Sequence, residues 1–359
     1  MSEWSDENRH DGMIDAFTRA KCACRDKIHE VWYSFGGHAV RVRVIGNRLA
    51  ERLALPFAHL RCQKSDPSHA RLTIDLWDQL ETGISAGIDA SPDPLSLSSR
   101  FSTSEDERFV TSVLQHSITS FDRQEEHIVG AALDADQLSL YEYGRPLHVP
   151  LSLWYNERGV PLIHAALISY KGDGILLAGS SGAGKTSSSL SCMLAGFHYL
   201  ADDSAGLEIQ AAGDFWGHSV YSSAFVDEQT IHRLPALSEH AIPGKYSYED
   251  KQLVFVSQAG SPELMRRTRI RVVCLVRITD GDRSGVRPAT KRESLLTLTR
   301  SLLLSGVLSS GKRGFELLGR LSDNVPSFWL EVGPDPEDIP RCIRTLLLDN
   351  QSLTERRAV

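Results

Sequence analysis

The sequence has no long apolar run. No stretch approaches the roughly 20 apolar residues that a helix needs to cross a bilayer. The first residues, MSEWSDENRHDGMIDAF, lack the basic and then apolar order of a secretion signal, and no internal repeat is visible. We therefore expect a cytoplasmic protein without a membrane partner. The length of 359 residues suits two or three domains with buried cores.

An excess of positive charge is also absent. Lysine and arginine number 39 against 46 acidic residues, a net charge of -7, which argues against a general nucleic-acid partner because few cations are available to replace the counterions of a phosphate backbone. The 41% hydrophobic and 24% charged residues are typical of a globular protein. The six cysteines are scattered, which favours reduced thiols, and the Cys22-Ala-Cys24 spacing is too short for a usual structural zinc site.

The most informative stretch that is present contains the octapeptide GSSGAGKT at 179–186. Two glycines with four residues between them, followed by lysine and a hydroxyl residue, form the phosphate-binding loop pattern. Gly179 and Gly184 predict positive φ angles, which let successive N–H groups line a cradle for phosphate oxygens. Lys185 would add a positive charge on the β- and γ-phosphates, and the Thr186 hydroxyl would bind Mg²⁺.

The segments on either side of this loop support the pattern. Residues 174–178, GILLA, predict a buried strand, and residues 186–195 predict a helix that ends at Gly196. The start of that helix would direct its positive dipole end at the phosphates. A Gly/Ser-rich surface turn is the alternative, but it requires neither the Lys-Thr pair nor the strand. The residues expected to contact the nucleotide are Gly179, Ser181, Gly182, Ala183, Gly184, Lys185, Thr186 and Ser187.

Two carboxylates follow the next predicted strand. Residues 197–201, FHYLA, are succeeded by Asp202 and Asp203. Open α/β sheets bind their ligands at the carboxyl ends of the strands, so both side chains are expected near the loop. Beside a bound Mg·nucleotide, one carboxylate would bind the metal and the other would accept a proton. An aspartate pair that caps a turn is the structural alternative.

His164, the Lys171-Gly172-Asp173 turn, the GSSGAGKT loop and the LADD strand end together resemble the kinase core of the HPr kinase/phosphorylase family. That family is a phosphate-loop relative of phosphoenolpyruvate carboxykinase. The resemblance is strong over about residues 160–210, weaker to about 350, and says little about the first 140 residues. It implies an α/β fold with a P-loop kinase core of the HPr kinase C-terminal-domain type.

The resemblance also implies ATP and Mg²⁺ as cofactors and a role for each residue. Lys185 and the loop glycines would hold the triphosphate, and Thr186 and Asp203 would lie at the metal. Asp202 would be the base for the acceptor hydroxyl, and His164 would hydrogen-bond the acid centre. Without the family, a satisfied core side chain would be the better interpretation of His164.

Members of the family phosphorylate serine in the phosphocarrier protein HPr or in precursor peptides of lasso-type natural products. The resemblance therefore implies a peptide or small-protein partner that carries the acceptor serine. Members often assemble, which leaves a homo-oligomer open. The Glu-x-Arg-Gly-Leu-Gly segment of true HPr kinases has no clear counterpart between Ala211 and Lys251. That segment accompanies the phosphorylase activity, so its absence favours divergent relatives such as the lasso-peptide precursor kinases.

We predict an ATP- and Mg²⁺-dependent kinase that transfers the γ-phosphoryl group to a serine hydroxyl of a peptide or small protein. Two alternatives stay open: a kinase of a small-molecule alcohol, and a non-catalytic nucleotide-binding regulatory module. The expected domains are a small α+β N-terminal unit at 1–80, a linker or mobile loop at 81–107, the catalytic domain at 108–350 and a polar tail at 351–359.

Several local predictions complete the analysis. Residues 1–15 are expected to fray, residues 137–147 to add a strand, and residues 214–218 and 221–225 to form a β-hairpin. Core packing is favoured over adenine stacking for the aromatic residues Tyr141, Tyr143, Trp154 and Tyr155. A cation beside the γ-phosphate would stabilise the transfer. The candidates are Lys245, ranked first because it follows Pro243-Gly244, and then Lys251, Arg266 and Arg267.

Overall fold

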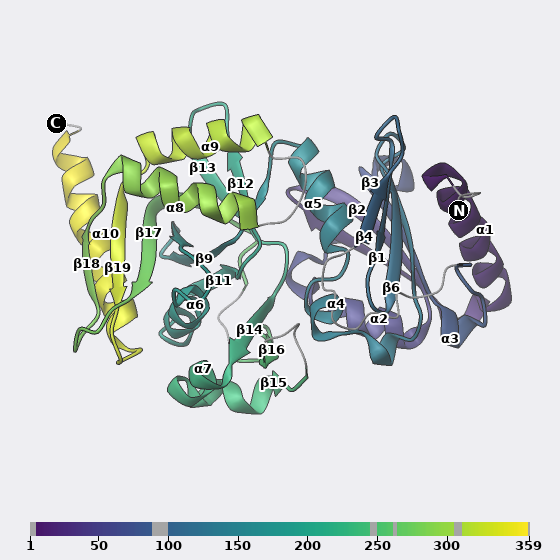
Figure 1. Ribbon diagram of the computed structural model, residues 1–359, viewed down its shortest axis with the longest axis horizontal. Helices are drawn as coiled ribbons and strands as arrows, with labels where there is room; N and C mark the ends of the chain where they lie inside the picture. The colour runs from purple at the N-terminus through teal and green to yellow at the C-terminus, as the bar shows by residue number, and fades with distance from the viewer. Residues whose placement is uncertain (1–4, 88–99, 245–249, 261–263, 305–310, 358–359) are drawn as a thin grey trace. The chain divides into compact units, whose positions relative to one another are not determined.

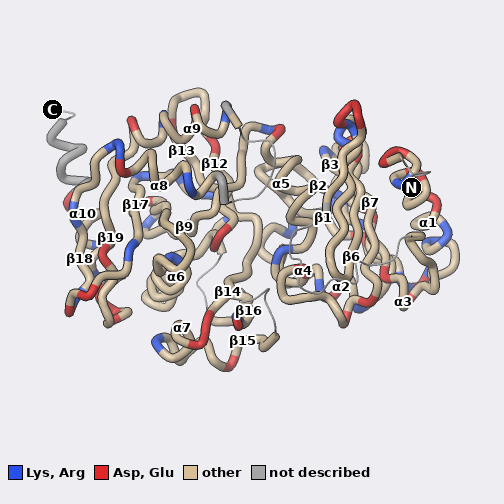
Figure 2. The backbone as a smooth tube through the Cα atoms, in the orientation of Figure 1, with Lys and Arg blue, Asp and Glu red and all other residues tan. Residues whose placement is uncertain are grey.

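The computed structural model describes residues 5–87, 100–244, 250–260, 264–304 and 311–357. The chain divides into two compact units (Figure 1), each of mixed α/β structure. The first unit is Met1–Trp154 with Pro243–Lys251, and the second is Tyr155–Ile242 with Gln252–Val359. Acidic and basic residues are both spread over each of the two units (Figure 2). Among the helices of these residues, none combines the length and apolar character needed to cross a membrane.

A mixed seven-stranded sheet is the centre of the first unit. Its strand order is β1-β2-β3-β7-β6-β5-β4. The β2, β3 and β7 strands run parallel to one another, and all other neighbours are antiparallel. The strands are β1 (Ile28–Phe35), β2 (His38–Ile45), β3 (Leu72–Asp78), β4 (Arg100–Thr103), β5 (Phe109–Val113), β6 (Ser117–Asp122) and β7 (His127–Ala132).

This sheet differs from the expected domain division. Because β3 pairs with β7 across the predicted linker, a boundary between residues 80 and 108 would cut a single sheet. The contacts instead place the division at Trp154 and Tyr155. Within the predicted linker, 88–99 lies outside the described residues, whereas α3 (Gln79–Thr82) and β4 occupy parts of its two ends.

The helix α1 (Asp6–Ala23) covers one face of this sheet (Figure 1). Ser5 caps the helix by accepting the Asn8 N–H at 3.2 Å. Met13 and Phe17 recur at helical spacing and are buried against the sheet, so the prediction that 1–15 frays is wrong for the described residues 5–15. The remaining helices of this unit are α2 (Asn47–Ala54), α3, α4 (Leu140–Gly144) and α5 (His148–Glu157), which extends past the unit boundary.

The α4 helix replaces the strand predicted at residues 137–147. The hydroxyl of Ser139 accepts the Glu142 N–H, and the Glu142 carboxylate in turn accepts the Ser139 N–H, which is a capping box. The prediction overlooked this Ser-x-x-Glu signal. The aromatic residues in the same region, Tyr143, Trp154 and Tyr155, are buried, which confirms their interpretation as core residues.

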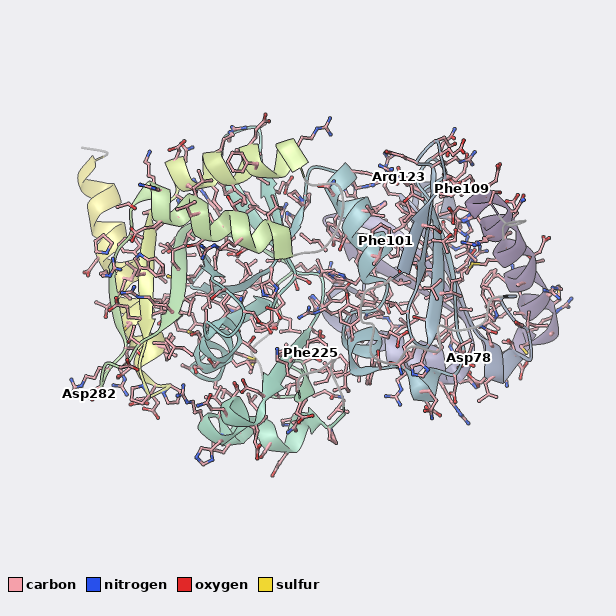
Figure 3. All side chains as sticks on the ribbon, in the orientation of Figure 1. Asp78, Phe101, Phe109, Arg123, Phe225 and Asp282 are labelled. Atoms are coloured by element: carbon pink, nitrogen blue, oxygen red, sulfur yellow. The ribbon has the colours of Figure 1, made fainter. Side chains whose placement is uncertain are left out.

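A buried histidine lies between α1 and the sheet. The His10 ring lies 5.2 Å from the ring of Phe109, which Figure 3 labels. His10 Nδ1 lies 2.9 Å from the Ser120 hydroxyl. Burial lowers the pKa of His10 from 6.5 to about 4; the charge of His127 also lowers it, and that of Asp122 raises it. His10 is therefore neutral in the folded protein at neutral pH.

We expect the free energy of unfolding to fall as the pH is lowered from 7.5 to 4.5. Because the folded pKa of His10 is depressed, the unfolded chain binds a proton between about pH 6.5 and 4 that the folded chain does not. The stabilisation from neutral His10 is complete above that window, and the loss of stability reaches about 3 kcal/mol at its acid end. Urea unfolding of the wild type and of His10→Gln measures it. The variant should lose less stability on acidification, and equal losses would contradict this origin.

A nine-stranded sheet is the centre of the second unit. Its order is β11-β9-β10-β17-β13-β12-β8, and β19 joins β17 to β18. The strands are β8 (Leu162–Ile163), β9 (Ala165–Tyr170), β10 (Asp173–Ala178), β11 (His198–Ala201), β12 (Ala205–Ile209), β13 (Phe215–His218), β17 (Arg267–Ile278), β18 (Gly285–Pro288) and β19 (Ser327–Val332). A smaller sheet has the order β14-β16-β15, with β14 (Ser223–Asp227), β15 (Ala241–Ile242) and β16 (Lys251–Phe255).

Helices cover both faces of the nine-stranded sheet. Cys192 of α6 and Ile343 of α10 pack into the apolar cluster on one face, and Leu298 of α8 and Leu318 of α9 pack into the cluster on the other. The helices are α6 (Lys185–Leu194), α7 (Glu228–Arg233), α8 (Lys291–Leu304), α9 (Gly311–Asn324) and α10 (Asp338–Arg357). The predicted hairpin of residues 214–218 and 221–225 is wrong, because β13 pairs with β12 whereas β14 belongs to the smaller sheet.

Candidate functional site

The strand order brings the predicted site residues to one edge of the large sheet. The β10 strand runs antiparallel to β9 and parallel to β17, and Ala178 at its end pairs with Ala165 and Leu275. His164 immediately precedes β9, and Asp202 immediately follows β11, the outer neighbour of β9. The 179–186 loop, His164 and the aspartate pair therefore meet where β10 ends. All of these residues belong to the second unit.

The loop owes its shape to three glycines with different roles. Gly182 and Gly184 have φ angles of +74° and +95°, in the left-handed region that favours glycine. Gly179 does not, so its predicted positive φ is wrong. A Cβ on Gly179 would instead lie 2.8 Å from the Val276 carbonyl oxygen and 3.1 Å from Cβ of Ala183. Gly179 is required because β17 passes close to the loop.

We expect Gly179→Ala to destabilise the second unit by about 1–3 kcal/mol, because the backbone on both sides of the added methyl group cannot move away freely. Gly285→Ala on β18 is a matched control, since its Cβ would meet no atom within 4 Å and its φ is not positive. Urea unfolding followed by circular dichroism measures both variants. Equal stabilities of the two would contradict the close approach.

The Lys185 side chain is folded back over the loop. Its ammonium group donates to the carbonyl oxygens of Gly179 at 3.1 Å and Ser180 at 3.0 Å, and the residue is 4% exposed. A buried ammonium that faces main-chain carbonyls can exchange these partners for phosphate oxygens when an anion enters the loop. Lys185 is thus a buried lysine held against the backbone of the 179–186 loop.

The other predicted loop residues lie around this lysine. Ser181 is exposed at the tip of the loop. The Ala183 N–H donates to the Ser180 carbonyl at 3.2 Å, which closes the turn. The Ser187 hydroxyl donates to the Gly184 carbonyl at 3.1 Å. Thr186 is the second residue of α6, and its side chain points toward Asp202.

The two aspartates have different partners. The hydroxyl of Thr186 donates to the Asp202 carboxylate, with distances of 3.1 and 3.0 Å to its two oxygens, and Asp202 is buried. The neighbouring Asp203 has a φ of +59°, a conformation that aspartate tolerates better than most residues. Its carboxylate lies 3.4 Å from His164 Nε2. The two side chains therefore form a Thr186–Asp202 pair and a His164–Asp203 pair.

These pairs differ from the roles that the resemblance implied for the aspartates. Asp202 was expected to be the base and Asp203 the metal neighbour, but it is Asp202 that bonds the candidate metal ligand Thr186. The Thr186–Asp202 oxygens are hard ligands of the kind that Mg²⁺ prefers. Within the described ranges, no three His, Cys, Asp or Glu side chains gather to hold a metal alone. A bound Mg²⁺ would thus rely largely on phosphate oxygens and water, as is usual for this ion.

Two neighbours of the site were not anticipated from the sequence. Ile278, at the carboxyl end of β17, is 54% exposed, and its side chain approaches the position of a Cβ on Gly184 to 3.5 Å. The carbonyl of Ser301 on α8 accepts the His164 N–H at 3.0 Å and fixes the start of β9. A parallel pairing of β10 with β17 would have placed Ile278 beside the loop. The sequence around Ser301 carries no local signal that it lies near His164.

Of the predicted γ-phosphate cations, Arg266 and Arg267 lie away from the loop. Lys245, ranked first, lies outside the described residues. Arg266 and Arg267 lie at the amino end of β17, whereas its carboxyl end adjoins the loop. The Arg267 guanidinium lies over the Trp216 ring, 4.8 Å from its centre. Lys251 begins β16 and belongs to the first unit.

The chain was compared with known families, curated proteins and solved structures. No family model matches it, and no curated protein is significantly similar to it in sequence. Among solved structures, it is similar to the Hpr(Ser) kinase/phosphatase from Coxiella burnetii. The two are 12% identical, the match covers 54% of this chain and 95% of that chain, and the TM-score is 0.33. At this TM-score the two folds are only distantly alike.

Proposed function

We propose that this protein is a kinase that binds Mg·ATP at the 179–186 loop and transfers the γ-phosphoryl group to a hydroxyl acceptor. The observation that carries the proposal is the arrangement at the end of β10. A glycine loop, a buried lysine and two differently partnered aspartates occupy one sheet edge. Phosphoryl transfer requires little covalent chemistry from the protein and depends on positioning and charge stabilisation, which these groups can supply.

The 179–186 loop would bind the phosphates of ATP. Gly182 and Gly184, with their positive φ angles, form a turn of the kind that directs N–H groups at an anion. Lys185 would leave the carbonyls of Gly179 and Ser180 and neutralise charge on the β- and γ-phosphates. Mg²⁺ would be held by Thr186, with Asp202 fixing its hydroxyl, and would neutralise charge between the same phosphates.

The His164–Asp203 pair would act on the acceptor hydroxyl. Asp203 would accept the proton of the attacking hydroxyl, and His164 would orient the carboxylate through the 3.4 Å contact. His164 is itself held by Ser301, so the pair is supported from α8. This assignment exchanges the roles that the family resemblance implied. The bond from the acceptor oxygen to the γ-phosphorus would form as the bond from the γ-phosphorus to the β,γ-bridging oxygen breaks, and ADP would be the leaving group.

The acceptor that we propose is a serine side chain in a peptide or small protein. This proposal rests on the resemblance of the 160–210 segment to serine kinases. A panel of serine peptides, HPr and a mixture of small alcohols, incubated with Mg²⁺ and γ-labelled ATP, tests it. Label on a peptide serine supports the proposal. Label only on small alcohols would replace it with a metabolite kinase, and ATP binding without any transfer would favour a regulatory module.

A further inference from the structure

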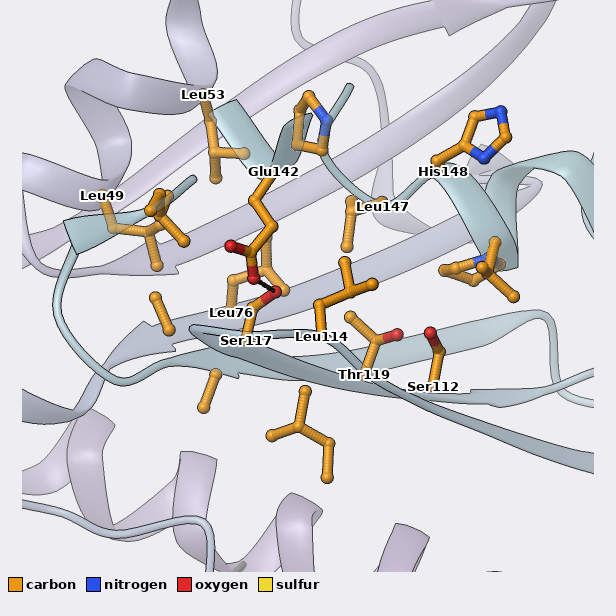
Figure 4. Close-up of a pocket in the computed structure, with 17 residues that line it drawn as sticks. Leu49, Leu53, Leu76, Ser112, Leu114, Ser117, Thr119, Glu142, Leu147 and His148 are labelled. Atoms are coloured by element: carbon orange, nitrogen blue, oxygen red, sulfur yellow. Dashed lines mark hydrogen bonds between the residues drawn. The ribbon is translucent and has the colours of Figure 1, made fainter. Parts of the chain in front are cut away.

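The first unit contains a partly open cavity on the face of its sheet opposite α1. The cavity has a volume of about 50 Å³ and is lined by residues of β3, β5, β6, β7, α2, α4, the start of α5 and the segments beside them (Figure 4). Six of its 17 lining residues are leucines, and all of the lining residues belong to the first unit. A buried water takes up about 10–15 Å³ on the same scale, so the cavity has room for about four non-hydrogen atoms.

Two hydroxyl groups line the floor of this cavity. Ser112 on β5 and Thr119 on β6 are directly opposite each other in the sheet. They are 3% and 9% exposed, and Figure 4 shows both hydroxyls on the side of the sheet that faces Leu147 and His148. Within the described part of the chain, neither side chain has a hydrogen-bond partner. Buried hydroxyls are normally paired, because leaving them unpaired is costly, so this pair indicates a bound polar atom.

The ionisable groups of the cavity are not available to a charged ligand. The Glu142 carboxylate already accepts hydrogen bonds from Ser139, from the Ser117 hydroxyl and from the His116 N–H. Burial lowers the pKa of His148 to about 3, so this ring is neutral, and its Nδ1 lies 2.9 Å from the Tyr141 hydroxyl. No lysine or arginine is among the described lining residues. An anion would lack a counter-charge, and a cation would meet only a saturated carboxylate.

We propose that this cavity binds a small neutral molecule with a hydroxyl or carbonyl group and a short aliphatic body. The polar atom lies between Ser112 and Thr119, where two hydroxyls can each donate or accept. The aliphatic part lies against Leu49, Leu76 and Leu147, and its burial there is favourable. Every residue that lines the cavity is in the first unit, whereas the 179–186 loop is in the second.

The test uses the full chain with methyl-labelled leucines, observed by NMR during titration with 1-propanol and, separately, under xenon. 1-Propanol has four non-hydrogen atoms and one hydroxyl, whereas xenon probes the apolar space alone. The expected result is a saturable shift of the Leu49, Leu76 and Leu147 methyl signals with 1-propanol. Thr119→Val and Ser112→Ala should each weaken 1-propanol binding about fivefold or more and leave the response to xenon intact.

Thr73→Val on β3 is the matched control, because it makes the same change on the opposite face of the sheet and should alter neither titration. If one variant fails to fold, the titration of the wild type still tests whether the cavity binds 1-propanol. Absence of a saturable shift with 1-propanol would mean that the cavity holds only water and would overturn the proposal. Binding of 1-propanol that is unaffected by both cavity variants would also overturn it, because the hydroxyl pair would then have no role.

Discussion

Replacing Lys185 by methionine is expected to weaken Mg·ATP binding about 30-fold. Methionine retains most of the length and apolar stem of lysine but removes the charge that faces the Gly179 and Ser180 carbonyls. A hydrogen bond to a charged group is worth about 1.5–3 kcal/mol, and 2 kcal/mol corresponds to a factor of about 30 in affinity. Calorimetric titration with a non-hydrolysable ATP analogue and Mg²⁺ measures the change.

A matched control lies at the opposite end of β9 and β10 from the loop. Lys171 lies in the turn between β9 and β10 and is exposed, and its ammonium group lies 5.5 Å from the centre of the Tyr170 ring. Lys171→Met removes the same charge from the same unit and should leave ATP affinity unchanged. If the two variants lost affinity equally, the effect would come from net charge and not from the loop.

The two aspartates are expected to give opposite kinetic signatures. Asp203→Asn should lower the rate of phosphoryl transfer about 10³-fold with little change in ATP affinity, because it removes the proton acceptor opposite His164. Asp202→Asn should instead raise the Mg²⁺ concentration needed for half-maximal rate about tenfold or more, because the carboxylate that holds the Thr186 hydroxyl is lost. Rates measured over a range of Mg²⁺ concentrations separate the two.

Asp173→Asn serves as the control for both variants. This carboxylate begins β10 at the other end of the strand and pairs with Arg271, so its loss should change neither the rate nor the Mg²⁺ dependence. The roles implied by the family resemblance predict the reverse pattern, in which Asp202→Asn abolishes transfer and Asp203→Asn alters the Mg²⁺ requirement. That outcome would contradict the assignment made from the geometry.

The local parts of the site were predictable because each has its own signal. The apolar run before the loop became β10, the residues after it became α6, and the aspartate pair follows β11 as expected. The strands β1 and β2 show a similar local signal, because polar and apolar residues alternate on either side of Gly36 and Gly37, which both have positive φ. These patterns depend on neighbours along the chain, which a sequence displays directly.

Pairings between segments that are distant in the chain could not be predicted from the sequence. Nothing near Leu72 indicates that β3 pairs with β7 fifty residues later, and so the first unit was divided too early. The partners of Asp202 and Asp203 depend on the φ of +59° at Asp203, which turns the second carboxylate toward His164. The role of Gly179 likewise depends on the passage of Val276, which lies almost 100 residues further along the chain.

The most direct measurement of the central claim is γ-phosphate transfer from labelled ATP by the wild type and by Asp203→Asn, with Mg·ATP binding measured on the same samples. We predict labelled acceptor with the wild type, and ATP binding that is retained with transfer nearly abolished in the variant. Equal transfer by both proteins would contradict the role of Asp203. A wild type that does not bind Mg·ATP would contradict the assignment of the 179–186 loop itself.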